Sequence, residues 1–118
     1  MSELLSSLES FCRIDGVKGA IITDADGKFI EKTSMDEVEF NALENLIKKS
    51  IKIGLDASAK FKKDALNQSY LEFEDQSLTS IMLANGCVLS VFTTSGVNLG
   101  RIRLEIKKNK KIIESLMG

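Results

Sequence analysis

Residues 36–61 read DEVEFNALENLIKKSIKIGLDASAKF, a segment with no proline and a single glycine, Gly54. Apolar residues recur every three to four positions in it, and this spacing predicts one long helix. Ser34 or Asp36 is placed to cap its start, and Ser34 with Glu37 matches the capping-box pattern. The fold is therefore expected to be built around a long helix in the middle of the chain.

This helix carries more apolar surface than a helix lying on one sheet needs. On a wheel at ~100° per residue, its apolar and small residues spread over about 180°, whereas ~100° is typical of a helix on one sheet. Ser50, Gly54 and Ala57 recur at i, i+4 and i+7 within this surface, a spacing that permits close backbone approach. We expect a second copy of the protein to cover the surplus. The alternative is a helix of the same chain.

Before this helix, the sequence predicts a shorter helix and two strands. Apolar residues at i, i+4 and i+7 predict a helix over residues 3–13. Residues 17–24 (VKGAIITD) are apolar on both faces at their centre, which is typical of a strand covered on both sides. Asp26-Gly27 then predicts a tight hairpin into a strand over residues 28–33.

After the long helix, three strands and a last helix are predicted. The strands are residues 69–75 (SYLEFED), 77–84 (SLTSIMLA) and 87–94 (CVLSVFTT), and Asn85-Gly86 is a strong hairpin turn between the last two. Apolar residues at helical spacing predict a helix over residues 98–117.

The predicted order is helix, two strands, helix, three strands, helix. Tight hairpins join the strands of each block, so the five-stranded sheet is expected to be antiparallel, with helices on both faces. This is an α+β architecture. The 118 residues contain no repeat or linker that would divide them, so one domain is expected over residues 1–118.

The composition excludes most catalytic chemistry. The chain has no histidine, which rules out His-containing triads and His-ligated zinc. Its two cysteines, Cys12 and Cys87, are too few for a four-thiolate zinc site, and we expect both to be buried thiols in a reducing compartment. Asp24 begins a DADG run, but positions 5 and 6 of a calcium loop would be Lys28 and Phe29, so a plain hairpin turn is favoured. We expect no enzyme activity and no cofactor.

The start of the chain carries an acidic residue, Glu3, and no apolar run approaches the ~20 residues that span a bilayer. A cytoplasmic protein without a membrane span is therefore expected.

Charge is unevenly distributed along the chain. The net charge is −1, which argues against a general nucleic-acid binder. Residues 98–118 hold six basic and two acidic residues, a local +4 that leaves −5 for the rest. A solvated helix face is the favoured interpretation of the basic residues, with phosphates, anionic lipid or an acidic partner as alternatives. The preceding Ser95–Gly100 is interpreted as a turn capped by Asn98 rather than an anion site.

The strand predicted over residues 69–75 begins a strand block after a long loop, so it is expected at the sheet edge. It has no proline or lysine to block pairing, and two subunits could join there by twofold symmetry. The alternative is a short polar edge protected by Glu72 and Glu74. The residues expected to form the pairing surface are Leu46, Ser50, Ile53, Gly54, Ala57, Tyr70, Leu71, Glu72 and Phe73.

Two stretches resemble a known family. Residues 13–24 (RIDGVKGAIITD), followed by Asp26-Gly27, are similar to the opening of the roadblock / dynein light-chain family. Residues 91–94 (VFTT), leading into 98–104 (NLGRIRL), are similar to its close. The resemblance extends over nearly the whole chain and includes the order of the elements.

This resemblance implies a profilin-like αββαβββα domain. Family members pair through their middle helices and third strands into a continuous ten-stranded sheet. They are non-enzymatic platforms that bind small Ras-like GTPases, as in bacterial gliding motility, or sit in scaffold and dynein complexes. No catalytic arginine is implied.

The leading hypothesis is a homodimeric adaptor that regulates a small Ras-like GTPase. Its partner-binding rim is expected at Asn45, Lys49, Lys52 and Asp56. The alternatives are a constitutive structural scaffold or motor light chain, and a small-ligand sensor.

Overall fold

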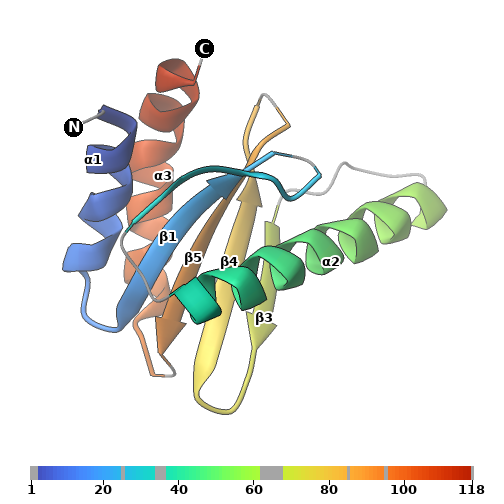
Figure 1. Cartoon of the computed structure of the whole chain (residues 1–118), viewed down its shortest axis with the longest axis horizontal. Coiled ribbons are helices and arrows are strands. Elements are labelled where there is room, and N and C mark those ends of the chain that lie inside the picture. The colour runs from blue at the N-terminus through green and yellow to red at the C-terminus, as the bar shows by residue number, and fades with distance from the viewer. Residues whose placement is uncertain are drawn as a thin grey trace.

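The computed structural model describes residues 3–24, 26–33, 37–61, 68–84, 86–94 and 96–117, with residues 37–39 and 58–61 described by their backbone alone. The predicted order of elements is confirmed, with a 3-10 helix, η1, following the first helix (Figure 1). The elements are α1 (Glu3–Glu9), η1 (Ser10–Arg13), β1 (Val17–Thr23), β2 (Phe29–Lys32), α2 (Glu37–Phe61), β3 (Gln68–Glu72), β4 (Gln76–Met82), β5 (Val88–Thr94) and α3 (Leu99–Leu116). The caps expected for α2, Ser34 and Asp36, lie outside the described residues.

The five strands form one sheet in the order β2-β1-β5-β4-β3, and every neighbouring pair is antiparallel, as predicted. The β1–β2 connection is a plain hairpin turn. Gly27 adopts a φ of +87°, and its N–H donates to the carbonyl of Asp24 at 3.1 Å. The Asp24 carboxylate accepts the N–H groups of Asp26 and Lys28, so its Oδ1 organises the turn itself.

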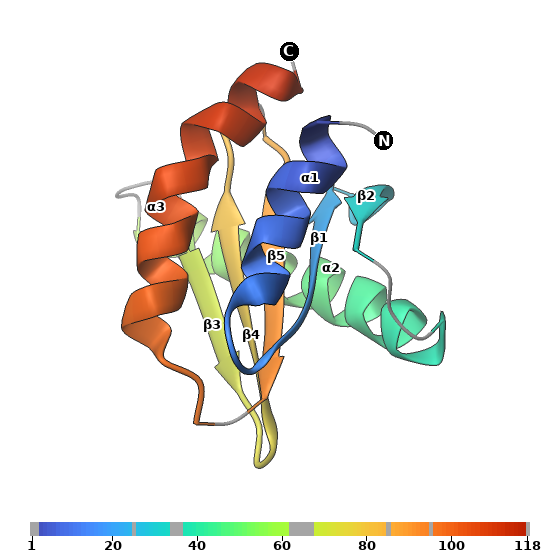
Figure 2. The same cartoon turned by 90° about the vertical axis from the view of Figure 1, so that its left-hand side faces the viewer.

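Helices cover both faces of the sheet, but unequally. Figure 2 shows α1 and α3 side by side on one face, while α2 lies on the other. Alternation along β1 divides the core accordingly: Ala20 and Ile22 pack toward α1 and α3, and Ile21 packs toward α2. Two buried apolar clusters result, one on each side of the sheet.

The last helix begins at a well-formed cap. Asn98 has an extended backbone, and its Oδ1 accepts the N–H of Arg101 at 3.1 Å, as the sequence predicted. Asn98→Ala is expected to lower the free energy of unfolding by about 1 kcal/mol, because that N–H loses its intramolecular partner. Urea denaturation measures the change, and Asn98→Asp, which keeps a capping oxygen, should retain most of the stability. Equal unfolding midpoints for wild type and Asn98→Ala would contradict this role.

The expectation of two buried cysteines is wrong for Cys12. Cys12 is exposed, because η1 turns its neighbour Phe11 into the core and leaves Cys12 on the outside. Cys87 is half-buried next to the core. Desolvation, and to a smaller extent the negative charge of Asp24, raise the pKa of the Cys87 thiol above its ordinary value.

Candidate functional site

The long helix α2 packs on the sheet through one stripe of side chains. Leu43, Ile47 and Ile51 are buried there, in a cluster that includes Leu78 and Phe92 of the sheet. Since α1 and α3 occupy the opposite face (Figure 2), neither covers the remaining surface of α2. The intrachain alternative for the surplus apolar surface is therefore wrong.

Among the side chains of α2 that the structure describes, the two exposed large apolar residues lie in the second half of the helix. The C-terminal part of the helix projects beyond β3, the last strand of the sheet (Figure 1). In this half of the helix, Ile53 is 69 % exposed and Leu55 is 45 % exposed. A helix that extends past the sheet loses the layer that would bury its side chains, so Ile53 is accessible to a partner.

The two flanks of α2 face different parts of the molecule. On one flank, Leu46 shares a groove of about 230 Å³ with Phe73, at the β3–β4 turn. On the other, Leu55 lines a hollow of about 240 Å³ with Asp26 of the β1–β2 turn. Ile53 follows Leu46 at i+7 and therefore lies on the flank that faces β3. The structure thus brings the predicted helix and strand residues to the same side of the molecule.

Strand β3 forms the edge of the sheet, as predicted. The Phe73 N–H donates to the carbonyl of Gln76 at 2.7 Å, and inward and outward pairs alternate along an antiparallel ladder. It follows that the N–H groups of Tyr70 and Glu72 point away from β4. The opposite edge, β2, carries Lys32, a residue type that blocks edge pairing, whereas β3 has no lysine.

The predicted pairing residues are not equally available. Ile53, Ala57, Glu72 and Phe73 are exposed, whereas Leu46, Gly54, Tyr70 and Leu71 are half-buried. Ser50 is buried in its own chain at 7 % exposure, and its hydroxyl donates to the carbonyl of Ile47 at 3.0 Å. Ser50 therefore offers a partner little surface, so the prediction that it forms part of the pairing surface is corrected.

The predicted partner rim lies on the outer side of α2. Asn45, Lys49, Lys52 and Asp56 are all exposed and recur at i, i+4, i+7 and i+11, so they form a polar row along the helix.

An aromatic cluster that the sequence did not predict lies near the start of α2. The rings of Phe29 and Phe40 meet edge to face at 5.6 Å, and the Lys32 ammonium lies 4.9 Å from the centre of the Phe40 ring. These contacts join α2 to β2. Phe29, the one aromatic residue in a polar strand, was the available sequence signal.

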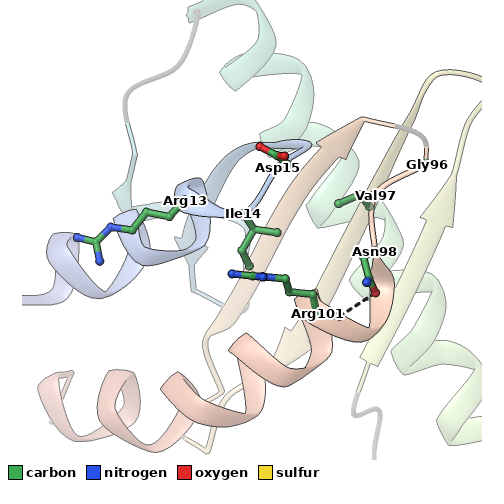
Figure 3. A pocket seen from close by; sticks show the side chains of 7 residues that line it. All are labelled: Arg13, Ile14, Asp15, Gly96, Val97, Asn98 and Arg101. Carbon is green, nitrogen blue, oxygen red and sulfur yellow. Dashed lines mark hydrogen bonds between the residues drawn. The ribbon is translucent and has the colours of Figure 1, made fainter.

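A separate hollow of about 380 Å³ lies where η1 ends and α3 begins (Figure 3). Arg101 extends beside Ile14, while Arg13 extends away from the rest of the hollow, so the two guanidinium groups do not converge on one point. The Asn98 oxygen is already used as the helix cap. This arrangement gives no support to an anion site here.

The described ranges contain no cluster of three or more His, Cys, Asp or Glu side chains suited to a metal ion. Among the described helices, none is both long and apolar enough to cross a bilayer. The principal feature is thus an apolar helix flank beside an open strand edge, which can bind another polypeptide.

Comparison with known proteins agrees with this architecture. A family model described as "Mitogen-activated protein kinase kinase 1 interacting" matches residues 3–118. No significant match was found among curated proteins.

Solved structures extend the comparison. A Roadblock/LC7 domain from Streptomyces avermitilis is similar at a TM-score of 0.88 and 16% identity, with 98% of each chain covered. Myxococcus xanthus MglB is similar at a TM-score of 0.86 and 16% identity, covering 99% of this chain and 96% of that one. An MglB with a tetrameric arrangement has a TM-score of 0.83 at 14% identity, covering 96% of this chain and 86% of that one. At these identities the likeness establishes the roadblock fold.

Proposed function

Because this chain belongs to the mitogen-activated protein kinase kinase 1 interacting family and has the roadblock fold, we propose that it is a homodimeric, non-enzymatic adaptor that binds and regulates a small Ras-like GTPase. The observation that supports this most directly is the apolar flank of α2 beside the open β3 edge. A twofold pairing would extend the sheet through β3 and place the two α2 helices side by side. Ile53 would then be covered by the partner copy.

Pairing of this kind leaves the outer row of α2 accessible. Asn45, Lys49, Lys52 and Asp56 would be duplicated on one face of the dimer, and the GTPase would bind across them. Regulation would follow from differential affinity: a dimer that binds one switch-loop conformation more tightly shifts the GTPase toward that conformation.

The test uses purified small Ras-like GTPases loaded with GDP or with a non-hydrolysable GTP analogue. We expect the immobilised protein to retain a GTPase in one nucleotide state, and Lys49→Glu with Lys52→Glu to weaken that binding by about tenfold or more. Lys107→Glu with Lys111→Glu, which changes the charge equally at exposed positions of α3 on the opposite face of the sheet, is the matched control. Failure to retain any GTPase in either state would refute the proposal.

The second candidate is a constitutive scaffold with no effect on nucleotide turnover. The family description favours it, since it names interaction with a kinase kinase rather than with a GTPase. GTP hydrolysis and nucleotide exchange, measured with and without the protein, distinguish the two. A scaffold would leave both rates of a bound GTPase unchanged, whereas a regulator changes at least one of them.

A further inference from the structure

The outward face of α3 is strongly cationic. Ile102, Ile106 and Ile113 turn inward and are fully or almost fully buried. The five exposed basic side chains of the helix are Arg101, Arg103, Lys107, Lys108 and Lys111. From Arg101 to Lys111 the helix rises by roughly 15 Å, so these charges form a continuous surface rather than a point.

The two acidic residues of α3 offset this surface only in part, and Glu105 lines a hollow together with Arg101, Leu104 and Lys108. Glu105 accepts a hydrogen bond from the Asn109 amide at 3.0 Å. The Glu114 carboxylate accepts the backbone N–H of Ala84, which follows β4. Both carboxylates keep their charge, but the exposed cations outnumber them, so the outward face has a net positive charge.

An apolar residue lies at the centre of the charges. Leu104 is 66 % exposed, and Arg101, Lys107, Lys108 and Lys111 lie at i−3, i+3, i+4 and i+7 from it. These are the spacings of helical neighbours, so cations surround Leu104 on its own face. Ile112, which is 49 % exposed, adds apolar surface at the flank. Cations around exposed aliphatic side chains are typical of helices that lie on anionic lipid.

The charge of the whole chain favours an extended anionic surface over a small acidic ligand. The last 21 residues carry +4 and the rest carry −5, so an anionic bilayer attracts the α3 side and repels the body. A plane of headgroups contacts all the cations at once, which a single phosphate cannot do. Since α3 has no aromatic residue, it lacks the stacking platform expected for single-stranded nucleic acid.

We propose that the outward face of α3 docks the protein peripherally on an anionic lipid bilayer, with its lysines and arginines at the headgroups and Leu104 in the interface. This surface belongs to each chain and does not depend on pairing or on a GTPase. Because α2 lies on the opposite face of the sheet, docking leaves the predicted partner rim accessible.

Co-sedimentation with vesicles tests the proposal. The full chain should bind vesicles that contain phosphatidylserine, remain in solution with phosphatidylcholine alone, and dissociate at high salt. Lys107→Gln with Lys111→Gln should lower the partition coefficient roughly 30-fold, given the typical contribution of each basic residue. Lys28→Gln with Lys48→Gln removes equal charge away from α3 and should bind as wild type.

A spectroscopic readout tests the position of Leu104. The chain has no tryptophan, so Leu104→Trp provides a single reporter whose emission should shift to shorter wavelength on phosphatidylserine vesicles. Failure to bind anionic vesicles, even if polyglutamate binds, would overturn the proposal and assign the face to an acidic protein. Sedimentation without an emission shift would also overturn it, because Leu104 would then stay in water.

Discussion

Under the proposed twofold pairing, Ile53→Asp is expected to convert the dimer to a monomer and to weaken association roughly 100- to 1000-fold. Burying an isoleucine side chain contributes about 1.5–3 kcal/mol, and a twofold interface contains this side chain twice. An aspartate at the same place would bring an unpaired carboxylate into an apolar contact, which costs more again. Because Ile53 is 69 % exposed in the single chain, the stability of the monomer should change little.

Sedimentation velocity over a range of protein concentrations measures this effect, and thermal unfolding checks that the variant is folded. The matched control is Leu55→Asp, which places the same charge on an exposed apolar residue of the same helix. Leu55 lies on the flank that faces the β1–β2 turn, so this variant should pair as wild type. A wild-type protein that remains monomeric at high concentration, or equal association of wild type and Ile53→Asp, would contradict the proposed interface.

The sequence predicted the fold well because the faces of its elements are clearly patterned. Residues 36–61 alternate apolar and polar positions at helical spacing over their full length, and α2 spans Glu37–Phe61. The Asp-Gly turn predicted the first hairpin. The strand predicted over residues 69–75 has no proline or lysine to block pairing, which is consistent with the place of β3 at the sheet edge. Patterns of this kind are compatible with many sequences, so solved structures at only 14–16% identity have the same fold.

The site was predicted less completely. A helical wheel gives the angle of each side chain around the helix axis, but it does not show which of these side chains face the sheet. Ser50 lies within the wide apolar arc, yet the sheet covers it, because it is adjacent to the buried Ile47 and Ile51. The wheel also gave no signal for which flank of α2 faces β3. That depends on the groove shared by Leu46 and Phe73, which are far apart in the sequence.

The positions of the charged side chains on α3 were also only partly predicted from the sequence. Composition gave a net charge for the segment, but the direction in which each charged side chain points depends on tertiary contacts. Glu114 is directed to the Ala84 backbone, 30 residues earlier in the chain, and no local pattern predicts that hydrogen bond. The sequence therefore predicted the net charge of α3 but not the position of the Glu114 carboxylate.

Glu72→Pro is expected to abolish pairing through β3 while leaving the chain folded, with association weakened by roughly 100-fold. In each copy, the proline removes an N–H that points away from β4 and places a ring where the partner strand would lie. An intermolecular hydrogen bond contributes about 0.5–1.5 kcal/mol, it is lost in both copies, and the clash of the ring adds to this. The ladder to β4 survives, because proline is tolerated on an edge strand where its nitrogen faces outward.

Two variants separate the backbone effect from other causes. Glu72→Ala removes the same side chain but keeps the N–H, so it should still form a dimer in sedimentation velocity, with far less loss of association than Glu72→Pro. Leu71→Pro removes an N–H directed at β4 and should instead lower the free energy of unfolding, since the ladder pairs Leu71 with Leu78. If Glu72→Pro still sediments as a dimer, the two sheets are not joined through β3, and any pairing must rest on α2 alone.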